Sequence, residues 1–137
     1  MLITNEKFLK HVAPKKLVTA FDVSGSISYS DRELYVATMH GLVNNCTRKK
    51  GMPIMLTFDH DVYDVTVDVN VQLARIGGTD IEQCMTYIKV LDKPDVVLYI
   101  TDGYVCWPKE NILPRIEQYV HFTGPQPFEA PSYIKII

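Results

Sequence analysis

Three short oxygen-bearing side chains lie within five residues of one another, between Asp22 and Ser26. Asp22, Ser24 and Ser26 offer a carboxylate and two hydroxyls, and Gly25 lets the backbone turn tightly between the serines. Hard oxygen donors of this kind suit Mg²⁺, Mn²⁺ or Ca²⁺ and suit Zn²⁺ or copper much less. Taken alone, the stretch is also ordinary turn chemistry, because aspartate, serine and glycine are common in turns. Its meaning depends on what the rest of the chain places beside it.

The oxygen-rich loop follows the short apolar run 17–21, which predicts a strand buried on both faces. Residues 62–69 alternate between apolar and polar side chains, which predicts a half-solvated antiparallel edge strand. The other expected elements of this kind are buried strands over 54–58 and 95–101, further short strands over 119–123 and 133–137, and a lead-in segment over 1–14 compatible with one short helix.

Two helices are predicted between these strands. The first spans residues 31–50, with a capping box formed by Ser30 and Glu33 at its start, a basic last turn, and Gly51 as its stop. The second begins after Gly77-Gly78-Thr79-Asp80 and carries an apolar stripe at helical spacing.

This order of elements predicts a Rossmann-like α/β fold in a single domain over 1–137. The fold has a mainly parallel central sheet, one antiparallel edge strand, and helices on both faces. Right-handed crossovers put strand 17–21 in the middle, so the strand order reverses between it and strand 95–101. The ligand crevice of such sheets lies beyond the carboxyl ends of the strands at the reversal. Asp22 ends one of these strands and Asp102 ends the other, so we expect the two carboxylates to meet there.

These residues resemble a known site. Asp22-x-Ser24-x-Ser26, followed by Thr79 in a Gly-Gly-Thr-Asp loop and Asp102 in Ile-Thr-Asp-Gly, is similar to the metal-ion-dependent adhesion site (MIDAS) of von Willebrand factor A (VWA) domains. The resemblance runs from about Leu17 to Thr123 and is closest to the compact bacterial VWA-like type. In longer proteins those domains follow a metallopeptidase region, which this sequence lacks.

The resemblance implies a metal-dependent protein-interaction module with no catalytic activity of its own. Ser24 and Ser26 would coordinate Mg²⁺ (or Mn²⁺) directly, and Thr79 directly or through water, while Asp22 and Asp102 would lie partly behind ordered waters. Mostly neutral direct ligands leave the metal able to take an Asp or Glu carboxylate from a partner protein. Bacterial relatives often work beside ATPases of the AAA+ class or metalloenzymes, which suggests partners of that kind.

Several of these residues have simpler interpretations as well. Thr79 also begins a capping box with Glu82, although Asp80 can cap the helix instead. Tyr104 and Trp107 follow Asp102 and would form a partner-binding rim of the crevice, or would pack over a loop. The trio Asp59-His60-Asp61 is read as a polar hairpin turn rather than a second site.

Composition narrows the function classes. A chain of 137 residues, 47% apolar and 22% charged, describes a soluble globular domain. A net charge of −2 does not suggest binding to nucleic acid or to an anionic membrane through bulk charge. Three widely spaced cysteines predict reduced thiols in a cytoplasmic protein, and no apolar run resembles a signal peptide or a membrane span.

Two other functions stay open at this stage. A Mg²⁺- or Mn²⁺-dependent hydrolase of phosphate esters would use Asp22 and Asp102, although the sequence has no evident nucleophile–base pair and no lysine-bearing phosphate loop. A scaffold with an unused metal site would rely on assembly instead. Two helices give little cover to an apolar sheet, which predicts an exposed apolar patch for a partner or for a second copy in a homo-oligomer.

Overall fold

The computed structural model describes residues 1–23, 29–67, 80–125 and 129–137. Within these ranges, six strands form one sheet in the order β3-β2-β1-β4-β5-β6, and every neighbouring pair is parallel except β2 and β3. The strands are β1 (Leu17–Asp22), β2 (Ile54–Phe58), β3 (Val62–Asp64), β4 (Val96–Thr101), β5 (Glu117–Phe122) and β6 (Lys135–Ile136). This is the expected Rossmann-like sheet, with β1 near its middle and one antiparallel edge strand.

The central strands are apolar on both faces because both faces are covered. Every residue of β1 and β4 is buried, and the two strands pair in parallel from Leu17 beside Val96 to Phe21 beside Ile100. Continuous apolar runs of this kind are typical of parallel strands between helical layers.

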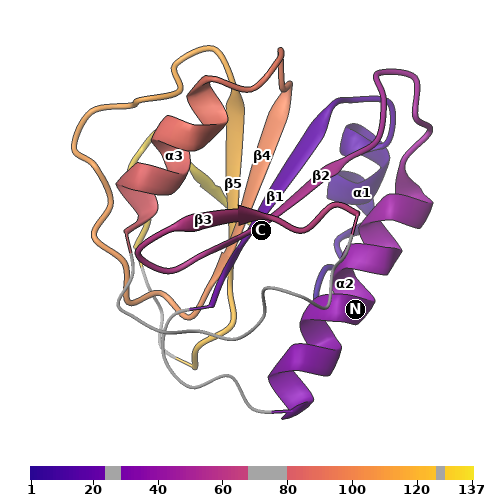
Figure 1. Ribbon diagram of the computed structural model, residues 1–137, viewed down its shortest axis with the longest axis horizontal. Helices are drawn as coiled ribbons and strands as arrows, with labels where there is room; N and C mark the ends of the chain where they lie inside the picture. Colours follow the sequence, from indigo (N-terminus) through magenta and orange to yellow (C-terminus); the bar gives the residue numbers. More distant parts are fainter. Residues whose placement is uncertain (24–28, 68–79, 126–128) are drawn as a thin grey trace.

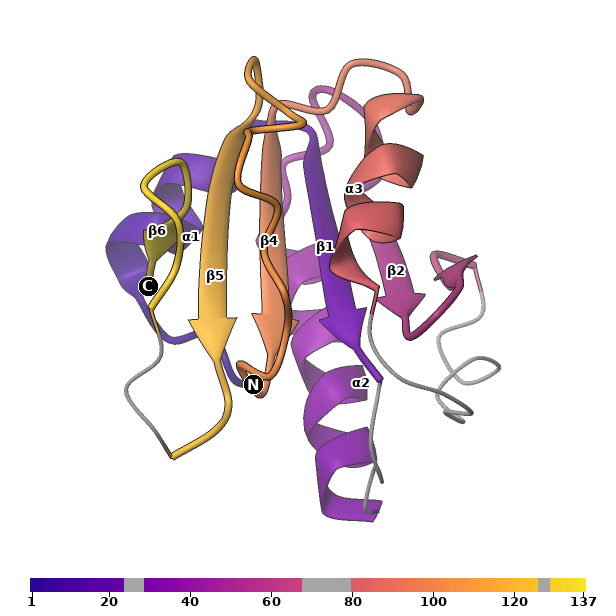
Figure 2. The same ribbon diagram turned by 90° about the vertical axis from the view of Figure 1, so that its left-hand side faces the viewer.

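Helices cover the two faces of the sheet unequally (Figures 1 and 2). The helices α1 (Glu6–Val12) and α2 (Tyr29–Asn45) share one face, where Phe8 of α1 and Met39 of α2 join a core with Phe21. The helix α3 (Ile81–Lys89) lies on the opposite face and packs its buried stripe on β1, β2 and β4. Helices therefore occupy both faces, as predicted.

Irregular segments complete the cover on the α3 face. Leu113 and Ile134 are buried there, and Trp107 and Tyr133 pack against the same core. Pro108 and Pro114 interrupt the first of these segments, and no helix forms between residues 104 and 116. The sheet thus has more apolar cover than two helices supply. The large apolar side chains that are exposed within the described residues come from separate places in the chain: Met1, Leu34, Met52, Val67, Val90, Tyr104 and Ile136.

The first long helix differs from the predicted span of 31–50. It begins at Tyr29, so Ser30 lies inside the first turn and is not the N-cap, and it ends at Asn45 with no basic residue in its last turn. Where α2 ends, residues 45 and 47 form hydrogen bonds to the end of α1 in place of further bonds within α2. The Asn45 side chain donates to the Leu9 carbonyl at 2.7 Å, and the Thr47 backbone N–H donates to the Ala13 carbonyl at 2.9 Å. These contacts stop the helix five residues before the point that residue spacing predicts.

The alternating segment after β2 is also shorter as a strand than predicted. β3 covers only Val62–Asp64. The Asp64 side chain then accepts a hydrogen bond from the Thr66 N–H at 2.9 Å, and the Thr66 hydroxyl accepts from the Met55 N–H at 3.0 Å. This local turn breaks the alternation, so Val65 is buried while Val67 is fully exposed. Residues 68 and 69 lie outside the described residues.

Candidate functional site

Asp22 and Asp102 line one crevice at the carboxyl edge of the sheet, where the topology predicts them. Phe21 and Ile100 are paired across β1 and β4, so Asp22 lies beside Thr101 and one residue short of Asp102. The crevice has a volume of about 370 Å³, and its lining comes from the N-terminal segment, the ends of β1, β4 and β5, and the start of α2: Leu2, Asp22, Asp31, Leu34, Tyr35, Asp102, His121, Phe122, Thr123 and Gly124.

Two hydroxyls hold Asp22 in place. The Thr101 hydroxyl donates to Asp22 Oδ2 at 2.6 Å, and the Tyr35 hydroxyl donates to the Asp22 backbone carbonyl at 2.7 Å. Asp22 is only 4% exposed. A hydrogen bond to an ionised carboxylate is short and strong, so Thr101 fixes the direction in which the other carboxylate oxygen points.

Asp102 is half-buried in the lining of the crevice and is held by its own turn. Its Oδ1 accepts a hydrogen bond from the Tyr104 N–H at 3.0 Å, and the Gly103 N–H donates to the Thr101 hydroxyl oxygen at 3.1 Å. Gly103 has a φ of +101°, a conformation that glycine adopts without strain. Thr101 therefore connects the two carboxylates, since one hydroxyl serves Asp22 and the turn that carries Asp102.

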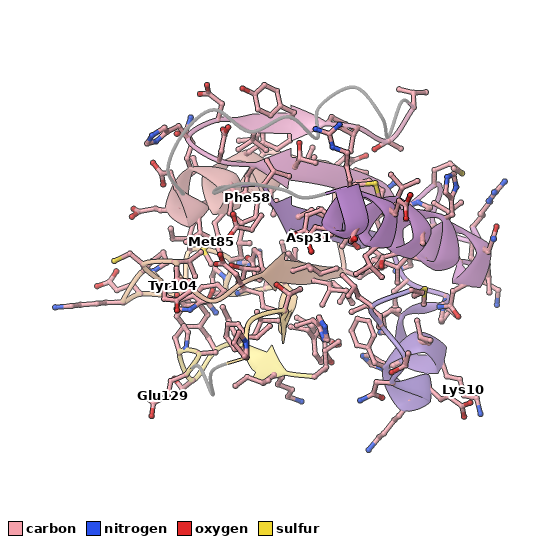
Figure 3. The ribbon with its side chains drawn as sticks, turned by 90° about the horizontal axis from the view of Figure 1, so that it is seen from below. Lys10, Asp31, Phe58, Met85, Tyr104 and Glu129 are labelled. Atoms are coloured by element: carbon pink, nitrogen blue, oxygen red, sulfur yellow. The ribbon has the colours of Figure 1, made fainter. Side chains whose placement is uncertain are left out.

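The helix α2 contributes Tyr35 and Asp31 to the lining of the crevice. Burial, and then the nearby carboxylates of Asp22, Asp102 and Asp31, raise the pKa of the Tyr35 hydroxyl far above its ordinary value, so it remains a donor. Asp31 adds a third carboxylate to the lining of the crevice. Figure 3 shows Asp31 on the α2 side of this edge.

His121 enters the crevice from the end of β5. Burial lowers the pKa of its imidazole, which favours the neutral ring near neutral pH. The described part of the crevice therefore carries three carboxylates and no cationic side chain.

The start of α3 fixes the end of the loop that carries Thr79. Asp80 is the N-cap, and its carboxylate accepts from the Gln83 N–H at 2.9 Å, which is the alternative cap considered from the sequence. The Asp80 N–H donates to the Asp59 carbonyl at 2.7 Å, which ties this loop end to the end of β2. Thr79 itself, with Ser24 and Ser26, lies outside the described residues.

The trio Asp59-His60-Asp61 forms a turn, as predicted. The Asp59 N–H donates to the Asp61 carbonyl at 3.0 Å, and the Asp61 N–H donates to Asp59 Oδ1 at 2.9 Å. The buried Asp59 carboxylate therefore takes part in holding the turn between β2 and β3.

The two aromatic residues assigned to the rim occupy different environments. Tyr104 is 71% exposed and lies toward the α3 side in Figure 3. Trp107 packs edge to face with Tyr99, with ring centroids 5.6 Å apart, and contacts the core under α3. Trp107 thus has the loop-packing contact considered from the sequence, while a role in partner binding stays a prediction for both residues.

The donor chemistry of the crevice fits a hard cation. The described residues supply carboxylate oxygens and no thiol to the lining. Within the described residues, no group of three or more His, Cys, Asp or Glu side chains is arranged to hold a metal ion. Hydroxyl ligands of the kind predicted at Ser24, Ser26 and Thr79 would have to complete such a set.

Sequence reasoning missed three contributors to the site. Asp31 and Tyr35 fall inside the helix predicted over 31–50, and Thr101 ends the buried strand predicted over 95–101. Each assignment describes the residue's own element, and only the pairing of β1 with β4 and the packing of α2 place these side chains beside Asp22. A polar residue directly before the predicted strand-end Asp102 is the one signal that the sequence carried.

Comparisons with known proteins agree with this architecture. Residues 17–137 match the family model described as "VWA-like domain (DUF2201)". Fourteen chains of solved structures match, and one of them is the crystal structure of an aerotolerance-related membrane protein from Bacteroides fragilis NCTC 9343 with multiple mutations to serines. It is 18% identical with a TM-score of 0.56, over 77% of this chain and 66% of that chain. The chain thus spans slightly less than two thirds of that protein's length, and the likeness shows the fold. No curated protein matches the sequence.

Proposed function

Because the chain belongs to the VWA-like domain family, we propose that it is a protein-interaction module whose crevice binds a divalent metal and, through that metal, an acidic side chain of a partner protein. The family match covers 17–137 and thus includes every residue of the predicted metal site. Mg²⁺ is the proposed ion, with Mn²⁺ as its closest substitute. The site is a MIDAS of the compact VWA type.

The observation that carries this proposal is the charge of the crevice. Asp22, Asp31 and Asp102 all line it, and its described lining contains neither lysine nor arginine. These three negative groups alone would repel a partner's carboxylate. A divalent cation reverses that balance locally, so metal and acidic ligand should bind together.

The proposed ligands have separate roles. The hydroxyls of Ser24, Ser26 and Thr79 contribute neutral oxygens, while Asp22 and Asp102 balance the charge and orient the other ligands, in part through water. When bound, the metal supplies an open coordination position for an anionic oxygen. Thr101 and Tyr35 hold Asp22 so that the carboxylate is oriented before metal arrives.

The partner and the cellular setting are part of the proposal. An AAA+ ATPase or a metalloenzyme that presents an Asp or Glu fits the family resemblance. Within the described residues, no helix has the length and apolar character needed to cross a bilayer. We place the protein in the cytoplasm because its three cysteines are free thiols, one of them buried.

The test combines metal binding with capture of a partner. Calorimetry of Mg²⁺ and Mn²⁺ binding should give one site in the wild-type chain, and Asp22→Asn and Asp102→Asn should abolish or strongly weaken it. Asp92→Asn is the matched control, because Asp92 is exposed and lies outside the crevice. Proteins retained on the immobilised chain in Mg²⁺ should be released by chelator. If the same proteins are retained in the presence of chelator and by the Asp22→Asn variant, the proposal is contradicted.

A further inference from the structure

A second recess lies between α1 and the β5–β6 edge of the sheet, away from Asp22 and Asp102. Its volume is about 590 Å³. Phe8 and Tyr119 contribute an aromatic floor, with their rings edge to face and their centroids 5.0 Å apart. We call this recess the lysine groove, and its lining is Asn5, Lys7, Phe8, Lys10, His11, Tyr119, Lys135 and Ile137.

The lysine groove carries cations that the chain itself does not neutralise. Lys7, Lys10 and Lys135 are exposed, and within the described parts of the chain their ammonium groups form no ion pair. Figure 3 shows Lys10 on α1 at the outer margin of the molecule. Exposed ammonium groups around an aromatic floor complement an acidic ligand and repel a basic one.

The acidic groups near the lysine groove do not cancel this charge. Glu117 is already bound, because its Oε2 contacts His11 Nε2 at 2.7 Å and accepts from the Tyr119 hydroxyl at 3.0 Å. Those two contacts, with Lys15 nearby, hold the pKa of Glu117 below its ordinary value. Glu6 of α1 does not line the groove.

A third recess separates the lysine groove from the crevice and adjoins both. A smaller recess of about 220 Å³ lies between them, lined by Leu2, Ile3, Thr4, Asn5, His121 and Ile137. It shares Leu2 and His121 with the crevice, and Asn5 and Ile137 with the lysine groove. The three recesses therefore adjoin one another in succession beside the N-terminal segment, with the three carboxylates of the crevice at one end and the three lysines at the other.

We propose that the lysine groove binds a run of acidic residues in the same extended partner segment whose carboxylate reaches the crevice. Only the crevice end of this arrangement rests on the proposed function. The middle recess suits an apolar side chain, since Leu2, Ile3 and Ile137 line it. Each lysine–carboxylate pair at such an exposed site is weak, so affinity depends on several acting together and falls with ionic strength.

The probe is a fluorescein-labelled peptide of alternating Glu and Ser, with a Gln-Ser peptide of the same length as its uncharged counterpart. Binding is measured by fluorescence anisotropy in Mn²⁺ and in EDTA, at low and high ionic strength. The test variant combines Lys7→Gln, Lys10→Gln and Lys135→Gln. The matched control combines Lys49→Gln, Lys89→Gln and Lys109→Gln, which removes the same charge from exposed positions outside the lysine groove.

We expect the groove variant to bind the Glu-Ser peptide about tenfold more weakly at low ionic strength, in Mn²⁺ and in EDTA alike, and the control to stay within about twofold of wild type. The wild-type chain should bind the Glu-Ser peptide more tightly in Mn²⁺ than in EDTA. Equal wild-type binding in Mn²⁺ and EDTA, with the groove variant still weaker than wild type, would overturn the crevice and leave the lysine groove supported. Wild-type affinity in the groove variant, or an equal loss in the control, would overturn the lysine groove.

Discussion

Thr101→Val removes the hydroxyl that donates to Asp22 Oδ2 at 2.6 Å and keeps the shape of the side chain. Thr101 is fully buried and Asp22 nearly so, hence water cannot readily replace the lost donor. A hydrogen bond to a charged group contributes about 1.5–3 kcal/mol, and the Gly103 N–H loses its acceptor as well. We therefore expect the free energy of unfolding to fall by about 2–3 kcal/mol, with a melting temperature lower by roughly 10 °C.

Thr19→Val is the matched control. Thr19 lies in β1, is fully buried like Thr101, and its hydroxyl has no hydrogen-bond partner within the described part of the chain. Valine replaces this unpaired polar atom with a methyl group, so the same substitution should here raise the free energy of unfolding by about 1 kcal/mol. Both substitutions remove a buried threonine hydroxyl, and the main difference between them is what that hydroxyl contacts in the wild-type protein.

The assay is urea unfolding of wild type and both variants, first in chelator and then in saturating Mg²⁺. Loss of a residue that orients a metal ligand typically costs about 10–100-fold in metal affinity, so Mg²⁺ should stabilise Thr101→Val less than it stabilises wild type. Thr19→Val should keep the full stabilisation by Mg²⁺. Equal stability changes in the two variants would refute the assignment of Thr101 as the residue that holds Asp22.

Three further predictions concern other parts of the chain. The Lys16 backbone N–H and then Lys50 lower the pKa of Asp95. The carboxylate therefore stabilises the fold above the unfolded-state pKa of about 4, and this stabilisation is lost as the pH falls below that value. Asp95→Asn should reduce the midpoint of urea unfolding at pH 7 and leave it unchanged near pH 2. Burial raises the pKa of the Cys84 thiol, so a thiol reagent should label exposed Cys106 in the native protein and Cys84 only on unfolding, and early labelling of Cys84 would contradict its burial. Asp80→Ala removes the N-cap of α3 and should lower the free energy of unfolding by about 1 kcal/mol, whereas Asp80→Ser should restore most of it.

The sequence was sufficient to predict the architecture and the meeting of two carboxylates. Apolar runs without alternation identified β1 and β4 as central strands, and crossover handedness placed them side by side. The convergence of Asp22 and Asp102 on one crevice then follows from the strand topology and does not depend on the conformation of the intervening loops. The sequence also offered Asp80 as one of two candidate caps of α3, and Asp80 is the N-cap in the structure.

Features that depend on tertiary contacts could not be predicted in this way. Asn45 ends α2 because its side chain meets the end of α1, which no property of residues 31–50 indicates. The alternation after β2 stops at an Asp64–Thr66 turn, although its apolar pattern continues. Tyr35 lies within the first helix that the sequence predicts, but its hydroxyl contact with Asp22 depends on where α2 packs on the sheet.

The most direct measurement of the central claim is anomalous X-ray scattering from crystals of the chain grown with Mn²⁺. The account predicts one strong manganese peak in the crevice between Asp22 and Asp102, absent from crystals of Asp22→Asn grown in the same way. A crevice without a peak at saturating Mn²⁺, or a peak unchanged by Asp22→Asn, would contradict it.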